Sequence, residues 1–143
     1  MNHLAIMRKS WGLLPKILTG EKVIESRWYK NKYAPYDKIK EGDVVYFKNS
    51  GEPVSVKAGV SNVLQFSNLK PEKVKEILDK YGTLDGIGED EINKYYQMFE
   101  NKNYCLLVFL KEPESITPFE ISKKGFGAMS AWITIEDINS LKI

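Results

Sequence analysis

Apolar residues recur at helical spacing in three parts of the chain. The first predicted helix begins near residue 14, with Pro15 in its first turn, and ends at Gly20. The second runs from Pro71 to Gly82, and the third covers residues 89–101, with acids in its first turn. The apolar faces are Trp11, Leu14, Ile17 and Leu18 in the first, Leu69, Val74, Ile77, Leu78 and Tyr81 in the second, and Ile92, Tyr95, Tyr96 and Phe99 in the third.

Short runs of alternating or continuous apolar residues between these helices predict strands. The expected strands cover residues 4–7, 22–28, 43–48, 54–66, 104–110, 119–122 and 131–135, with a turn at 49–51 and loops at 29–42, 83–88 and 123–130. Neither a linker nor an internal repeat interrupts the series. Mixed short strands with a few helices indicate an α+β domain or a small barrel with helical insertions.

The composition fits one globular domain and narrows the possible chemistry. The chain has 143 residues, of which 43% are hydrophobic and 28% charged. Its longest apolar run, residues 105–110, is far shorter than the roughly 20 residues that cross a bilayer, and its first residues lack the pattern of a signal peptide. Cys105 and His3, each the only residue of its type, predict neither a disulfide, a zinc site nor a Cys–His catalytic pair. We therefore expect a cytoplasmic protein without a metal or other cofactor.

Positive charge is concentrated in the first part of the chain. Residues 1–40 contain 9 Lys and Arg against 3 Asp and Glu, whereas residues 41–143 contain 12 against 16. Only Arg8 and Arg27 are arginines. Each is more informative than any one lysine, because a guanidinium binds phosphate or carboxylate through two parallel hydrogen bonds. The asymmetry favours one face that attracts an anion.

The most informative motif is Gly-x-Lys-x-x-Glu-x-Arg at residues 20–27, which contains Lys22, Glu25 and Arg27. On a regular strand Glu25 and Arg27 share one face, while Lys22 and Ser26 share the other. A bulge near Lys22 would bring it round to Glu25. From the spacing alone, an exposed ion pair worth about 0–1 kcal/mol is as good an interpretation as a functional cluster.

Two further segments accompany this motif. Gly42 and Asp43 directly precede a hydrophobic strand, and residues 125–133 form a late glycine-containing segment that ends in a strand. With the opening strand, the helix ending at Gly20 and the motif itself, they make most of the chain resemble the ASCH domain family of the PUA-like superfamily. The resemblance implies a single domain over residues 1–143, an α+β fold in which helices flank a small PUA-like β-barrel with a cleft beside it.

The resemblance also implies a function. ASCH domains are associated with RNA binding, some act on RNA or on modified nucleosides, and the charged residues of the motif are thought to line the cleft. Here those residues are Lys22, Glu25 and Arg27. The family's small N-acetylcytidine amidohydrolases carry a threonine at the position of Glu25 and use it with the motif lysine and a distant glutamate. This chain departs from that pattern, since it has no hydroxyl at this position.

Residues 27–40 interleave cations with aromatic rings. Five Lys and Arg side chains stand against Asp37, with four aromatic side chains among them. Lysines neutralise phosphates, and a ring stacked on an unpaired base contributes about 1–3 kcal/mol, so the stretch suits single-stranded nucleic acid. The competing interpretation is a solvated loop whose tyrosines anchor it to the sheet. Trp28 is the expected anchor, and Tyr29 and Tyr33 are the expected stacking rings.

Several other side chains carry structural expectations. Trp11 and Trp132 are expected in the core, with the cleft wall as the alternative for Trp132. Cys105 is expected to be an inert buried thiol, and His3 to lie at the surface or at a strand edge. Four acids before and within the third helix are expected to complement its dipole rather than to bind a metal. They are Asp85, Glu89, Asp90 and Glu91. The loop at 123–127 is either a plain turn or a contact for phosphate or a base.

Two functional interpretations follow, with RNA or a nucleotide or nucleoside as ligand and no membrane. The first is a binding module, whose expected nucleic-acid-binding residues are Lys22, Glu25, Arg27, Tyr29, Lys30, Lys32, Tyr33, Lys124 and Ser130. The second is a hydrolase of RNA or of an acylated or otherwise modified nucleoside, with Lys22 and Glu25 as catalytic groups and water as nucleophile. Lys22 would be the general base if burial lowered its pKa, or would stabilise an anionic transition state. A protein-interaction role without nucleic acid is a third, weaker interpretation.

Overall fold

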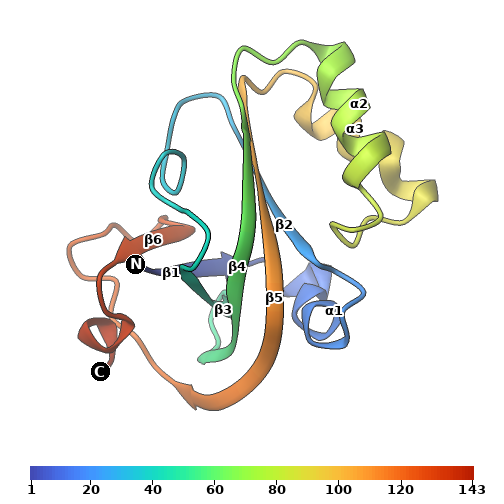
Figure 1. Cartoon of the computed structure of the whole chain (residues 1–143). Coiled ribbons are helices and arrows are strands. Elements are labelled where there is room, and N and C mark those ends of the chain that lie inside the picture. The colour runs from blue at the N-terminus through green and yellow to red at the C-terminus, as the bar shows by residue number, and fades with distance from the viewer.

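The computed structural model describes all 143 residues and combines one mixed sheet with three α-helices (Figure 1). The strands are β1 (Asn2–Met7), β2 (Ile24–Tyr29), β3 (Val44–Asn49), β4 (Val54–Phe66), β5 (Tyr104–Phe119) and β6 (Trp132–Ile135). The α-helices are α1 (Leu13–Thr19), α2 (Pro71–Tyr81) and α3 (Ile92–Phe99), and short 3-10 helices cover Lys9–Trp11, Glu89–Glu91 and Ile138–Leu141. None of the helices combines the length and the apolar character needed to cross a membrane.

The six strands form one curled sheet in the order β2-β5-β4-β3-β1-β6. β1 and β3 are parallel, and all other neighbours are antiparallel. The long strands β4 and β5 shift register at three points between Val54 and Asn62. Such bulges bend a strand and increase its twist, so the sheet curls into a half-barrel with β2 and β6 at its edges (Figure 1). The predicted α+β class is confirmed, and the barrel is an open one.

Alternate residues of β5 divide between two hydrophobic cores. Leu106 and Val108 belong to a core that also contains the apolar face of α1, while Cys105 and Leu107 belong to a core under α2 and α3. This division follows from the two-residue period of a strand. In Figure 1, α2 and α3 lie together beside the end of the sheet where β4 ends and β5 begins. The two cores therefore fix the helices on the sheet and define the space between α1, α3 and the edge strand β2.

Two strand boundaries differ from the predictions. Residues 104–110 and 119–122 were expected to be separate strands, yet β5 runs unbroken to Phe119 because its bulged pairing with β4 carries it through a polar segment. Of the second expected strand, Ile121 forms only an isolated bridge with Lys142. β2 begins at Ile24 rather than at residue 22, since the backbone N–H groups of Val23 and Ile24 donate to the Leu84 carbonyl outside the sheet.

The two helix-ending glycines act for different reasons. Gly20 has φ 81° and ends α1 in the left-handed conformation, as predicted. Gly82 follows α2 with a right-handed φ of −55°. A Cβ atom at Gly82 would lie 2.5 Å from both Ile92 Cδ1 and the Leu78 carbonyl oxygen. Because that oxygen belongs to the backbone and cannot move aside easily, a side chain is excluded there.

His3 is fully buried, which corrects the expectation of a surface or strand-edge residue. Its strand β1 lies inside the sheet between β3 and β6. His3 Nε2 lies 2.8 Å from Asp43 Oδ2, and the Trp132 indole N–H donates to Nδ1 at 3.2 Å. Because an indole nitrogen only donates, Nδ1 is the acceptor and Nε2–H donates to Asp43. Burial lowers the pKa of His3, although Asp43 opposes the shift.

Candidate functional site

The motif lysine is buried at the free edge of the sheet. The Lys22 side chain is 1% exposed, and its Nζ donates to the Ile24 and Asp85 carbonyl oxygens, both at 2.7 Å. Nζ also lies 2.5 Å from Asp85 Oδ1 and 3.2 Å from Glu25 Oε1. Lys22 precedes β2, and the outer edge of β2 has no partner strand. The Lys22 side chain lies along this edge and contacts Glu25 on one face of the sheet and Asp85 on the other. The strand start after Lys22, rather than a bulge, brings it beside Glu25.

Glu25 and Arg27 share one face of β2, as predicted. Arg27 Nε lies 3.0 Å and Nη2 2.8 Å from Glu25 Oε2. The guanidinium also donates to the Ala131 carbonyl at 3.4 Å and to the Ile6 carbonyl at 3.5 Å. It lies over the ring of the buried core residue Trp132, 5.0 Å from the centroid. Arg27 therefore joins the edge strand β2 to the opposite side of the half-barrel.

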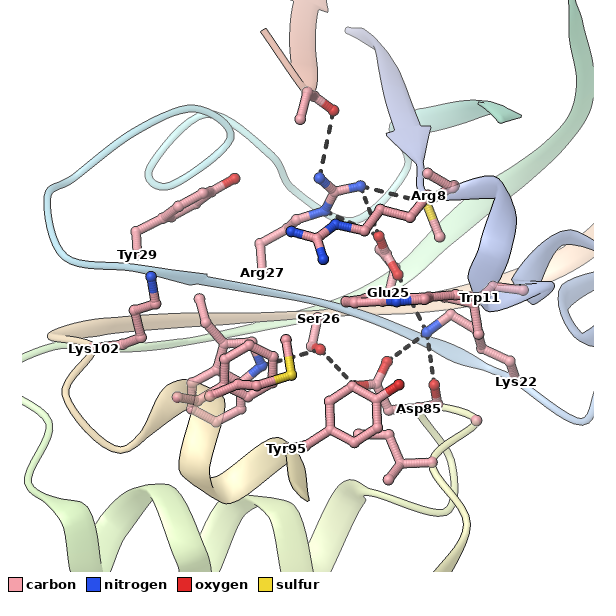
Figure 2. A pocket seen from close by; sticks show the side chains of 18 of the residues that line it. Arg8, Trp11, Lys22, Glu25, Ser26, Arg27, Tyr29, Asp85, Tyr95 and Lys102 are labelled. Atoms are coloured by element: carbon pink, nitrogen blue, oxygen red, sulfur yellow. Dashed lines mark hydrogen bonds and ion pairs between the residues drawn. The ribbon is translucent and has the colours of Figure 1, made fainter. Parts of the chain in front are cut away.

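Asp85 belongs to the same network, which the sequence did not predict. It was grouped with acids that complement a helix dipole, but it is buried in the loop after α2 and receives hydrogen bonds from Lys22 and from the Ser26 hydroxyl. Ser26 Oγ in turn accepts the Trp28 indole N–H at 3.1 Å. Figure 2 shows the resulting network around β2, with Glu25 and Arg27 on one side and Ser26 and Asp85 on the other.

The network contains two cations and two carboxylates, which balance each other. Burial alone would lower the pKa of Lys22, but Asp85 and Glu25 beside it raise that pKa above its ordinary value. Burial raises the pKa of Asp85 against the opposing effect of Lys22. Lys22 is therefore protonated at neutral pH, and its N–H bonds are all directed at acceptors. No group of three or more His, Cys, Asp or Glu side chains is arranged to hold a metal ion.

A pocket of about 360 Å³ opens in front of this network (Figure 2). Trp11, Tyr95 and Phe99 supply aromatic walls, and Ser26 and Arg27 lie at its back. Trp11 was expected in the core on the apolar face of α1. It instead precedes Gly12, which has φ 61° and separates the Lys9–Trp11 turn from α1, so the indole is half-buried and meets Tyr95 edge-on at 5.8 Å.

Two further cations line the pocket and were not among the predicted site residues. Arg8 lies over the Trp11 ring, 4.9 Å from its centroid, and Lys102 lies across the pocket beside Tyr29 (Figure 2). Neither Arg8 nor Lys102 forms an ion pair. Arg8 stands out in the sequence as one of only two arginines, but no sequence pattern indicates that Lys102 lies next to β2. The pocket therefore offers positive charge that no carboxylate neutralises.

The predicted binding residues separate into two groups. Lys22, Glu25, Arg27 and Tyr29 line the pocket. The others do not line it; they are Lys30, Lys32, Tyr33, Lys124 and Ser130. Lys32 pairs with Asp37 at 3.6 Å, Tyr33 packs edge-on against Tyr29, and the Ser130 hydroxyl donates to the Trp132 carbonyl. The expected anchor, Trp28, is buried and stacks on Phe99 with centroids 4.8 Å apart.

Solved structures share this fold. ASCH from Zymomonas mobilis aligns with a TM-score of 0.66 at 15% identity, over 99% of this chain and 96% of that chain. A tyrosine-to-phenylalanine mutant of that protein gives 0.67 at 15% identity, over 99% of both chains. The N-terminal domain of McrB from Staphylothermus marinus gives 0.50 at 17% identity, over 82% of this chain and 75% of that chain. No family model and no curated protein matches the sequence. The chain has an ASCH-like fold, in agreement with the sequence resemblance.

Proposed function

We propose that this chain is a nucleic-acid-binding module whose pocket holds one unpaired nucleotide of RNA. The observation that carries the proposal is the pairing of aromatic walls with two uncompensated cations, Arg8 and Lys102, around a cavity of about 360 Å³. Cavities of this size suit small ligands, and a nucleotide combines a flat ring with an anionic phosphate. The RNA association implied by the ASCH resemblance points to the same ligand class.

The charged motif has a different role from the rim cations in this proposal. Lys22 and Glu25 are almost completely buried and already paired, so they shape the back of the pocket rather than neutralise phosphate. Arg27 is 14% exposed and is held in place by Glu25, so its remaining accessible surface faces the ligand. Phosphate binding falls to Arg8 and Lys102, whose charges have no carboxylate to satisfy them.

The hydrolase alternative with Lys22 as general base has no support in this geometry. A general base must be deprotonated to accept a proton, whereas two carboxylates raise the pKa of Lys22. The proposal therefore predicts that RNA and acylated cytidine remain intact after incubation with the protein. Appearance of cleavage or deacylation products from the wild-type protein would contradict a purely binding role.

The proposal is tested by measuring the affinity for a short single-stranded RNA across a salt series. Arg8→Ala and Lys102→Ala should each weaken binding and flatten the dependence on salt by about one counterion per lost phosphate contact. Lys75→Ala is the matched control, because Lys75 lies on α2 away from the pocket and pairs with Asp79. Equal losses in all three variants would indicate diffuse electrostatic attraction and overturn the pocket as the site.

A further inference from the structure

The back wall of the pocket is formed by main-chain groups as well as by side chains. β2 is an edge strand, and its inner side pairs with Leu106, Val108 and Leu110 of β5. In an antiparallel pair the N–H and C=O groups of successive residues point alternately toward and away from the partner. The Leu110 N–H donates to the Val23 carbonyl, which shows that odd-numbered residues of this segment face β5.

Ile24 shows that the even-numbered residues of β2 face away from β5. Its N–H donates to the Leu84 carbonyl and its C=O accepts from Lys22 Nζ, both on the side away from β5. The next outward-facing residues are Ser26 and Trp28, and both line the pocket. Their N–H and C=O groups thus form a short row of donors and acceptors that no strand, loop or side chain of the protein pairs. In a pocket that opens to solvent, these groups are free to pair with water or with a ligand.

The unpaired row is too short for an added peptide strand. At one end the Leu84–Gly86 loop covers Ile24, and Lys22 occupies its carbonyl. At the other end the chain turns away after Tyr29, whose hydroxyl donates to the Ala34 carbonyl. What remains spans three residues, roughly 10 Å of strand, which suits one flat ring rather than an added strand.

Given the nucleotide-binding role proposed above, we propose that the free main-chain edge at Ser26 and Trp28 reads the nucleobase. A base entering from the rim pairs its adjacent donor and acceptor with an outward N–H and C=O of β2, while its phosphate lies near Arg8. Nucleobases carry such donor–acceptor pairs on their Watson–Crick edges, and in single-stranded RNA these edges are open. The ligand class is therefore a nucleotide whose Watson–Crick edge is unmodified.

The experiment titrates the isotope-labelled protein with AMP and UMP and with their edge-blocked derivatives, N6,N6-dimethyl-AMP and 3-methyl-UMP. For the nucleotide that binds more tightly, blocking the edge should weaken binding by about tenfold or more, as expected for loss of a bidentate base contact. Saturation with that nucleotide should also slow hydrogen exchange of the Ser26 and Trp28 amides. The Glu25 and Arg27 amides, which face β5, are protected already and serve as internal references.

Arg8→Ala separates the two proposals. It should weaken the parent and blocked nucleotides by the same factor, because it removes a phosphate contact and leaves the base contact. If the nucleotides bind with this Arg8 dependence but the blocked forms bind equally well and the two amides do not change, the base is read elsewhere and the inference fails while the proposed function stands. If no nucleotide binds at millimolar concentration, both fail together.

Discussion

At the scale of single residues, Lys22 is the side chain on which the buried network depends. Lys22→Met keeps the length of the side chain but leaves the Asp85 and Glu25 carboxylates buried beside an apolar group. Removing one partner of a buried ion pair is strongly destabilising, so we expect a loss of about 3–5 kcal/mol in the free energy of unfolding. Urea denaturation monitored by tryptophan fluorescence measures it.

The matched variant for this prediction is Lys22→Met combined with Asp85→Asn. The asparagine carries no charge and still accepts the Ser26 hydroxyl hydrogen bond. The double variant should recover part of the lost stability, because Asp85 is the carboxylate that loses its only cation, whereas Glu25 remains paired with Arg27. A double variant less stable than Lys22→Met would mean that Asp85 stabilises the fold independently of Lys22.

The residues of the network were predicted from the sequence only in part. Glu25 and Arg27 share a face because strand residues two apart always do, so their pairing could be foreseen. Asp85 could not be separated from the neighbouring acids, since its partner Lys22 lies 63 positions earlier in the chain. Lys102 was missed for the same reason. Local spacing identifies pairs within one element and says nothing about which distant loop covers a strand edge.

At the scale of elements, the Leu84–Gly86 loop positions the network by packing on the Lys22 stem. Gly86 has φ 82°, and a Cβ atom there would lie 3.3 Å from Lys22 Cβ. Gly86→Ala should cost about 1–2 kcal/mol from the left-handed backbone alone, plus the displacement of the loop. Thermal and urea denaturation should therefore show a larger loss than for the control Gly127→Ala.

Gly127 is a suitable control because it has nearly the same conformation in open space. Its φ is 87°, and no atom lies within 4 Å of an added Cβ. The difference between the two variants isolates the contact with Lys22. Equal losses would show that the loop moves aside freely and does not position Lys22.

The long strand β5 was predicted less accurately than α2 or the long strand β4, whose bounds match the prediction, for a physical reason. α2 begins at Pro71 as expected, because apolar residues three and four apart specify one buried face. β5 was divided in two because its second half is polar and is held by backbone pairing with β4 rather than by burial. Trp11 was misplaced because Gly12 turns the chain between it and α1, which changes the face to which the indole belongs.

At the scale of the whole molecule, two polar contacts join parts of the half-barrel that are distant in sequence. Arg27 connects β2 to the carbonyls of Ile6 and Ala131. His3 connects β1 to Asp43 before β3 and to Trp132 of β6. The ring of Trp132 meets both His3 and the Arg27 guanidinium, so the two contacts support the same strand.

This arrangement predicts a pH dependence of global stability. The folded protein favours neutral His3, because burial penalises the charged imidazolium more than the neighbouring Asp43 stabilises it. Its pKa is lowered from the ordinary value of 6.5, so the unfolded chain binds the additional proton as the pH falls. The contribution of neutral His3 to the free energy of unfolding is complete above about pH 6.5. It is lost below that pH, where the free energy of unfolding falls by at most about 1.4 kcal/mol per pH unit.

The measurement is the free energy of unfolding between pH 7.5 and 5 for the wild type and for His3→Gln. His3 is the only histidine, and glutamine retains a donor and an acceptor but does not titrate. Asp85 affects the free energy of unfolding in the opposite direction. Its pKa is raised in the folded state, so the folded state binds the proton more readily and gains stability as the pH falls. That contribution is common to both proteins and disappears from their difference. The wild type should therefore lose stability relative to His3→Gln as the pH falls. Parallel curves of unfolding free energy against pH would instead mean that water or a rearranged Trp132 accommodates the charged imidazole.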